Sequence, residues 1–279
     1  MTSTYQSGIP QQSLVCSMLR REPLMMWVAL SLLLLLTPLM VLHAVDTRQL
    51  GQEALWAKPM RFAFSLGIYL LTLAYLTSWM TQKARDGRLM QWTIRIGVAA
   101  IIFEQCWITL QAARGLHSHY NYDTLLATVM WALMGAGSIL LTLIAPVIGS
   151  KIWLAPNLSI PPSWRAGASL GLIIAFPLTV ITAGTMAAFG THHVMLTEEA
   201  GAVLPIFGWS LLHGDLRVAH FLATHSMQVI PLLAVAAAIV VGKSRVWPAF
   251  AIAFGYTLLV GIAFYQALAG SPFLEISRY

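Results

Sequence analysis

The sequence contains little charge. Of its 279 residues only 9% are Asp, Glu, Lys or Arg, whereas 58% are hydrophobic. Soluble domains carry about a quarter charged residues, so this composition excludes an ordinary soluble protein and is typical of membrane proteins. Cysteine is also scarce. The only two, Cys16 and Cys106, lie in different regions and indicate neither a disulfide framework nor a thiolate metal site.

The hydrophobic residues fall into runs that are long enough to cross a hydrocarbon core of about 30 Å. We expect seven spans, at 24–45, 60–80, 94–116, 124–148, 166–190, 216–241 and 247–269. The sequence therefore predicts an all-α, polytopic transmembrane helix bundle that forms one domain over 24–269. Residues 1–23 are expected to be a disordered cytoplasmic tail and 270–279 a short outer tail. The longest loop, 191–214, is expected to hold a partial helical turn.

Basic residues are concentrated at one end of these spans. With the N-terminus inside, ten of the sixteen Lys and Arg residues flank the cytoplasmic ends of the spans. The positive-inside rule thus predicts a cytoplasmic N-terminus and an exoplasmic C-terminus. The same rule accounts for the net charge of +6, so that no nucleic-acid partner is indicated.

All eight histidines fall on the outer side in this topology. They are His43, His117, His119, His192, His193, His213, His220 and His225. Tryptophan and tyrosine anchor helices at both membrane surfaces, but histidine has no such role. The one-sided distribution therefore favours a single polar site that opens outward.

The segment "GDLRVAHFLATHSMQ" (214–228) carries the most concentrated polar pattern. Asp215 is a good N-cap for the span that follows it. At 100° per residue Arg217, His220, His225 and Gln228 share an arc of about 140° with Phe221 and Thr224. A polar stripe this deep is expected to face the bundle interior, because contact with lipid costs several kcal/mol.

Two other spans offer polar faces that could meet this stripe. Lys58 and Arg61 begin a helical face that continues through Ser65, Tyr69 and Thr72. Glu104, the only carboxylate deep inside a span, shares a face with Gln111, and Arg114 lies close by. We expect these faces to converge on an outward-opening cavity.

Four blocks together resemble an uncharacterised family of bacterial multi-pass inner-membrane proteins: "WAKPMRFAFS", "QAARGLHSHYN", "GDLRVAHFLATHSMQ" and "YQALAG". The resemblance covers most of the chain and implies no activity. It implies a bacterial inner membrane as the location, with the lipid bilayer as partner. It also draws attention to Lys58, Arg61, Gln111, Arg114, His119, Asp215, Arg217, His220, His225 and Gln228. His192, His193 and His213 lie outside these blocks and are taken as incidental.

The first functional hypothesis is a haem b redox protein, which acts on a quinone or another small redox substrate. Imidazoles from different helices could ligate the iron, and cations could neutralise the propionates. His220 or His225 would supply one axial ligand and His119 or His43 the other. The cofactor-binding residues would be Lys58, Arg61, Gln111, Arg114, Arg217 and Gln228. Glu104 and Asp215 would handle protons or support the ligands.

Three alternatives remain open at this point. A non-haem Fe, Cu or Zn ion could use His119, His220 and His225, although an i, i+5 histidine pair diverges by about 140° on one helix. The polar residues could instead form a cofactor-free transporter or a lipid- or anion-binding protein. They could also join helices within a homo-oligomer, or within a larger membrane complex of which this protein is an accessory subunit.

Membrane zinc hydrolases of the ceramidase and adiponectin-receptor type use a Ser-x-x-x-His pattern that these spans lack.

Overall fold

The computed structural model describes residues 14–274 except 52, 156–159, 195–202 and 205–206. Residues 1–13 and 275–279 of the two predicted tails lie outside the described residues. Among the described residues, seven helical segments are long and apolar enough to cross a membrane, which confirms the predicted number of spans. The chain is therefore a multi-pass membrane protein with a nearly all-α fold.

The ends of the spanning segments lie within six residues of the predicted ends. Six are single helices: α2 (Pro23–Val45), α3 (Ala57–Thr77), α5 (Arg88–Arg114), α8 (Pro162–Phe189), α9 (Leu216–Val241) and α10 (Trp247–Leu268). The fourth differs from the prediction, because it consists of α6 (Leu125–Thr142) and α7 (Ile144–Leu154), which meet at Leu143.

Short elements connect the spans, and one of them corrects a prediction. Residues 14–21 form the helix α1 (Leu14–Arg21) rather than part of a disordered tail, and α4 (Gln82–Arg85) lies between α3 and α5. In the loop 191–214 the backbone N–H of Gly208 donates to the carbonyl of Leu204 at 2.8 Å, which is a single i→i−4 turn and not a helix. In the same loop β3 (His193–Val194) pairs with β4 (Gly214–Asp215) in an antiparallel ladder. A second antiparallel pair, β1 (Gln49–Leu50) with β2 (Glu53–Ala54), links α2 to α3.

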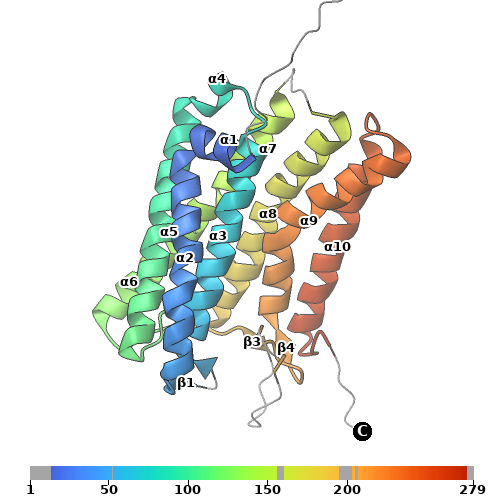
Figure 1. Ribbon diagram of the computed structural model, residues 1–279. Coiled ribbons are helices and arrows are strands. Elements are labelled where there is room, and N and C mark those ends of the chain that lie inside the picture. The colour runs from blue at the N-terminus through green and yellow to red at the C-terminus, as the bar shows by residue number, and fades with distance from the viewer. Residues whose placement is uncertain (1–13, 52, 156–159, 195–202, 205–206, 275–279) are drawn as a thin grey trace, which may run out of the picture.

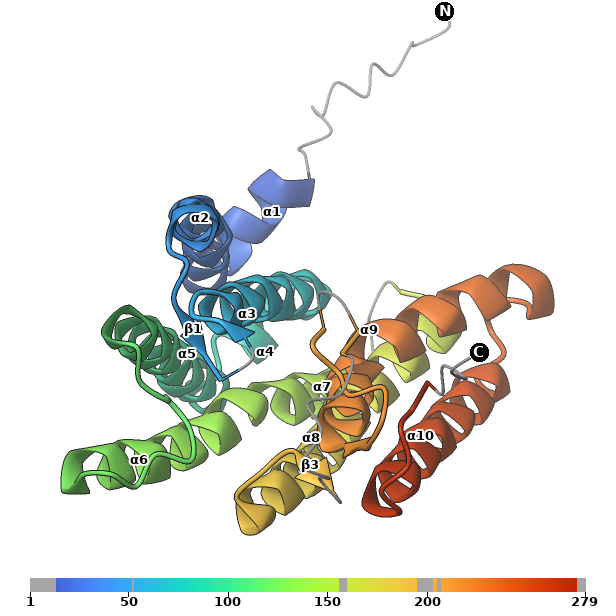
Figure 2. The same cartoon turned by 90° about the horizontal axis from the view of Figure 1, so that it is seen from below.

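The helices form two groups that stand side by side (Figures 1 and 2). In the first group α3 packs against α2 and α5, and in the second α9 packs against α8 and α10. The segment α6–α7 runs across from α5 to α8 and connects the groups. We call the end where α2, α5 and α8 finish and α3, α6 and α9 begin the histidine-rich end, because all eight histidines lie at it or in the helix turns next to it.

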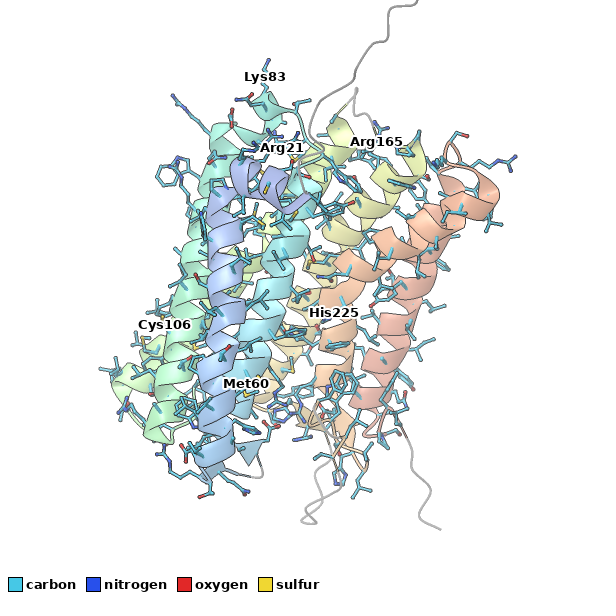
Figure 3. The ribbon with its side chains drawn as sticks, viewed as in Figure 1. Arg21, Met60, Lys83, Cys106, Arg165 and His225 are labelled. Atoms are coloured by element: carbon cyan, nitrogen blue, oxygen red, sulfur yellow. The ribbon has the colours of Figure 1, made fainter. Side chains whose placement is uncertain are left out.

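Basic side chains gather at the opposite end of the bundle. Figure 3 shows Arg21, Lys83 and Arg165 there, whereas Met60 and His225 lie toward the histidine-rich end. The structure therefore has the charge asymmetry from which the orientation is predicted.

Glycines allow α8 and α9 to pack closely. A Cβ atom on Gly171 would lie 2.9 Å from the backbone oxygen of Ser226 and 2.8 Å from Cδ of Pro231. On Gly167 it would lie 2.4 Å from Cβ of Ala234. Small residues at such crossings let the helix backbones approach and maximise van der Waals contact, which is the main source of helix association in lipid. The second group is therefore a tightly packed unit.

We expect Gly171→Ala to lower stability by about 1–3 kcal/mol, because the added methyl group has to separate α8 from α9. Gly184→Ala on the same helix is the matched control, since a Cβ atom there would meet no atom of the described residues within 4 Å. Alanine at that position should be neutral, or stabilising by up to about 1 kcal/mol, through its helix propensity. Thermal unfolding of both variants in detergent checks this, and equal melting temperatures would contradict the packing argument.

Candidate functional site

Glu53 joins the two helix groups at the histidine-rich end. It lies on β2, and its carboxylate forms salt bridges with Arg61 of α3 and Arg217 of α9. The distance from Arg217 Nη1 to Glu53 Oε1 is 3.4 Å. Glu53 is not among the site residues predicted from the sequence, although its position a few residues before Lys58 and Arg61 was the available signal.

Asp215 fixes the start of α9 and the direction of Arg217. Its carboxylate accepts hydrogen bonds from the backbone N–H of Arg217 at 3.0 Å, as the N-cap prediction requires, and from Ser210 N at 3.0 Å. Its two oxygens also accept from Arg217 Nε at 2.9 Å and Nη2 at 2.7 Å. Burial alone raises the pKa of Asp215, but these hydrogen bonds hold the pKa below its usual value. The buried carboxylate is therefore fully paired.

Arg61 and Arg217 also hold the chain segment that covers this end. Arg61 Nη1 donates to the carbonyl of Phe207 at 3.0 Å, and Arg217 Nη2 donates to the carbonyl of Gly208. Gly208 has φ +69°, and a Cβ atom there would lie 2.7 Å from Glu53 Oε1. Position 208 therefore requires glycine, both for its left-handed backbone conformation and because a side chain would collide with Glu53. Two of the predicted cofactor-binding arginines are thus engaged with carboxylates and backbone.

Lys58 and Glu104 form the charged centre of the interior. Glu104 on α5 is 4% exposed, and its Oε1 has no hydrogen-bond partner among the described residues. Gly137 of α6 leaves space beside it, because a Cβ atom there would lie 3.3 Å from this oxygen. Lys58 lies within range of charge interaction with Glu104 as well as with Glu53 and Arg217. Lys58 makes no salt bridge within the described part of the chain, which distinguishes it from Arg61 and Arg217.

The tautomers of the two α9 histidines follow from their partners. His225 Nδ1 lies 2.7 Å from the carbonyl oxygen of Phe221, and a carbonyl can only accept, so Nδ1 carries the proton. His220 Nδ1 lies 3.1 Å from Thr182 Oγ1, whose own proton goes to the carbonyl of Leu178. On this basis we assign the proton of the neutral His220 ring to Nδ1 as well. Both rings present Nε2 as a lone pair, which can bind a metal or accept a hydrogen bond.

His119 lies in the turn after α5, on the other side of the bundle interior. Its ring stands 5.9 Å from the ring of Phe62 and 5.2 Å from that of Trp131, and Nδ1 lies 3.1 Å from Ser118 Oγ. Burial, followed by the charge of Lys58, lowers the pKa of His119 well below its usual value. The ring is therefore neutral at physiological pH.

Gln111 and Arg114 lie at the end of α5 and do not contact the α9 stripe. Gln111 donates to the carbonyl of His117 at 3.2 Å and accepts from Arg114 Nη1 at 3.1 Å. These bonds close the turn that follows Gly115, whose φ of +70° ends the helix. Arg114 itself is exposed. The structure therefore gives these two predicted site residues a role in the α5 terminus.

Two further observations concern the predicted metal ligands and the predicted polar cavity. The described residues contain no group of three His, Cys, Asp or Glu side chains that could hold a metal ion. They do form an open apolar groove of about 430 Å³ between α8 and α10, lined among others by Pro177 and Phe254. That groove contains none of the predicted site residues.

We expect Glu53→Gln to destabilise the protein by about 1 kcal/mol, because two guanidinium groups lose part of their shared countercharge. The control is Asp123→Asn, at an exposed carboxylate that makes no salt bridge with a described residue. Thermal unfolding in detergent at low and high salt measures the difference. The loss in Glu53→Gln should shrink at high salt, and an equal loss in both variants would refute the role of Glu53.

His192 should make stability depend on pH. Burial, and then the positive charges of Arg217, His193 and Lys58, lower the pKa of His192 from 6.5 to about 3, although the negative charge of Asp215 acts in the opposite direction. The unfolded chain takes up this proton first, so the stabilisation is complete above pH 6.5 and is lost as the pH falls from 6.5 toward 3. The slope is at most about 1.4 kcal/mol per pH unit.

Melting temperatures between pH 8 and pH 5 check this expectation. His192→Gln should melt with a shallower pH dependence than the parent protein. His43→Gln, at an exposed position at the end of α2, should keep the parent slope. An unchanged slope in His192→Gln would show that this histidine is not the titrating group.

Comparisons with known proteins give no further guidance. No family model matches the chain, no curated protein matches it, and no solved structure matches it. The resemblance inferred from the four sequence blocks therefore remains a prediction. The function has to be argued from the residues and their geometry.

Proposed function

We propose that this protein is a membrane redox protein that binds haem b at its histidine-rich end, with His220 as an axial ligand. The main support is the tautomer of His220, whose Nδ1–H is anchored on Thr182 at 3.1 Å. Its Nε2 makes no hydrogen bond with a described residue. Histidines that ligate metals usually donate the other ring N–H to a protein acceptor, which orients the ring. Haem b, when bound, supplies an iron that exchanges single electrons.

The cations at this end divide into two kinds. Arg61 and Arg217 already pair with Glu53 and Asp215. Lys58 lies next to them without a salt bridge to any described residue, so it is the side chain available to hold an anionic group such as a propionate. Glu104, within charge range of Lys58, is the group that we assign to proton uptake.

A bare Fe, Cu or Zn ion fits these residues less well. Such an ion takes three or four protein ligands, and no such group exists among the described residues. The rings of His220 and His225 are also oriented by different partners. His220 Nδ1 bonds to Thr182 of α8, whereas His225 Nδ1 bonds to a carbonyl of its own helix. Haem needs only one or two imidazoles, which is the arrangement that these histidines offer.

The orientation of the proposed site follows from charge. The side chains of Arg21, Lys83 and Arg165 mark the opposite end of the bundle (Figure 3). The positive-inside rule supports a cytoplasmic location for that end, and hence an exoplasmic location for the histidine-rich end in a bacterial inner membrane.

The visible spectrum tests the proposal directly. We expect the purified protein to show a Soret band and, after reduction with dithionite, the α band of haem b, at about one haem per chain. His220→Ala should lose most of the haem, because its Nε2 is the proposed ligand. His117→Ala, at an exposed histidine whose ring has no role in the proposed site, is the matched control and should retain it.

Each other result has a defined meaning. A folded protein without a Soret band refutes haem binding, and elemental analysis for Fe, Cu and Zn then tests the metal alternative. If no metal is present either, the unpartnered Glu104 Oε1 beside Lys58 favours the second candidate function, a cofactor-free pathway or anion site.

A further inference from the structure

One boundary between helices differs from the others, and we call it the α3–α9 seam. It is formed by Arg61, Ser65 and Thr72 on α3 and by Arg217, His225 and Gln228 on α9. Glu53 closes it at the histidine-rich end, and deeper in the bundle Gln228 Nε2 donates to Thr72 Oγ1 at 3.3 Å. Between these two connections Ser65 is exposed and His225 is partly exposed, and Figure 3 shows His225 between the ribbons of α3 and α9. The seam is therefore bridged at two points and open between them.

The aqueous side of the seam is covered by aromatic rings. The rings of Phe207 and Trp209 lie 4.5 Å apart, and both contact Phe221, at 5.5 and 5.3 Å. Phe221 in turn stacks on His225 at 4.0 Å. The column extends from the covering segment down to His225, so it blocks a direct path from water to the imidazole.

The side of the seam that faces the bilayer is open. Leu232 lies two turns beyond His225 on the same face of α9 and is 68% exposed. Phe64 lies next to Ser65 on α3 and is 55% exposed. In a membrane these exposed apolar side chains contact lipid. A molecule that reaches His225 would therefore arrive from the lipid phase.

Two acceptors along the seam lack a donor among the described residues. His225 Nε2 carries a lone pair, as derived above. Thr72 Oγ1 donates its proton to the carbonyl of Ile68 at 2.8 Å, so it can only accept from Gln228, which fixes the amide with Nε2 toward Thr72. Gln228 Oε1 is then buried with no donor among the described residues. A buried acceptor without a donor is destabilising, and a ligand with hydroxyl groups would supply the missing donor.

We infer that the α3–α9 seam binds a lipid-soluble quinol, whose hydroxyl groups donate to His225 Nε2 and Gln228 Oε1. The ring of the quinol fits beside the aromatic column, and its apolar tail lies along Leu232 toward the bilayer. This inference rests on the proposed redox function, because it names the substrate class for that function. Binding of the quinol does not itself require haem.

The test uses the full chain in lipid nanodiscs and decylubiquinol as the probe. Binding is followed by quenching of tryptophan fluorescence, and an azido-quinone analogue locates the site by cross-linking and mass spectrometry. We expect saturable binding and cross-links on α3 and α9. His225→Leu should weaken binding about tenfold, through the loss of one hydrogen bond.

Two tryptophan substitutions one residue apart provide the sharpest comparison. Ser65→Trp fills the seam and should weaken binding at least tenfold, whereas Phe64→Trp changes only the lipid-facing surface and should leave binding within twofold of the parent. Thermal unfolding identifies any variant that does not fold, in which case the cross-link positions and His225→Leu still decide.

The inference is overturned if binding is not saturable, if Ser65→Trp and Phe64→Trp bind alike, or if the cross-links map to the α8–α10 groove. Its failure can be separated from failure of the proposed function. A haem spectrum without quinol binding refutes only the quinol site. Seam-dependent quinol binding without haem supports the site and refutes the haem proposal.

Discussion

A carboxylate shared by two guanidinium groups holds the histidine-rich end together. Glu53 accepts from Arg61 of the first helix group and Arg217 of the second, so it connects the two groups at this end. Ionisable groups near a bilayer must be paired, because an isolated charge there costs several kcal/mol. Asp215 completes the pairing of Arg217 and also caps α9. The covering segment at Phe207 and Gly208, and hence access to the interior, depends on these two arginines.

The same requirement determines which polar atoms remain available inside. Three donors near the proposed site have partners: His220 Nδ1 is held by Thr182, His225 Nδ1 by Phe221 and Gln228 Nε2 by Thr72. Two buried acceptors, Glu104 Oε1 and Gln228 Oε1, have no partner among the described residues. An interior rich in lone pairs favours a metal centre or a ligand that donates hydrogen bonds. It disfavours an anion except beside Lys58, the one interior cation that makes no salt bridge within the described residues.

Hydropathy predicted the spans well because each helix must satisfy its backbone hydrogen bonds internally in lipid. The polar faces of α3 and α9 were also predicted, since helical period alone places Arg61 with Thr72 and Arg217 with Gln228. Period does not say which neighbour a face meets, so Gln111 and Arg114 were assigned to the same site although they close the end of α5. Glu53 was missed for a related reason. It lies in a hairpin between spans, and its role arises only when α3 and α9 approach each other.

The contrast between two helix contacts explains why the seam is the place for a lipid-borne ligand. Between α8 and α9, Gly167 and Gly171 bring the backbones so close that a single Cβ atom would collide. By contrast, α3 and α9 are connected through long polar side chains, those of Glu53 and Gln228. Glycine contacts are rigid and exclude any guest, whereas polar bridges hold two helices at a distance and leave side chains such as Ser65 exposed between them. Because His225 and Gln228 lie on this looser contact, interior acceptors come within reach of the bilayer there.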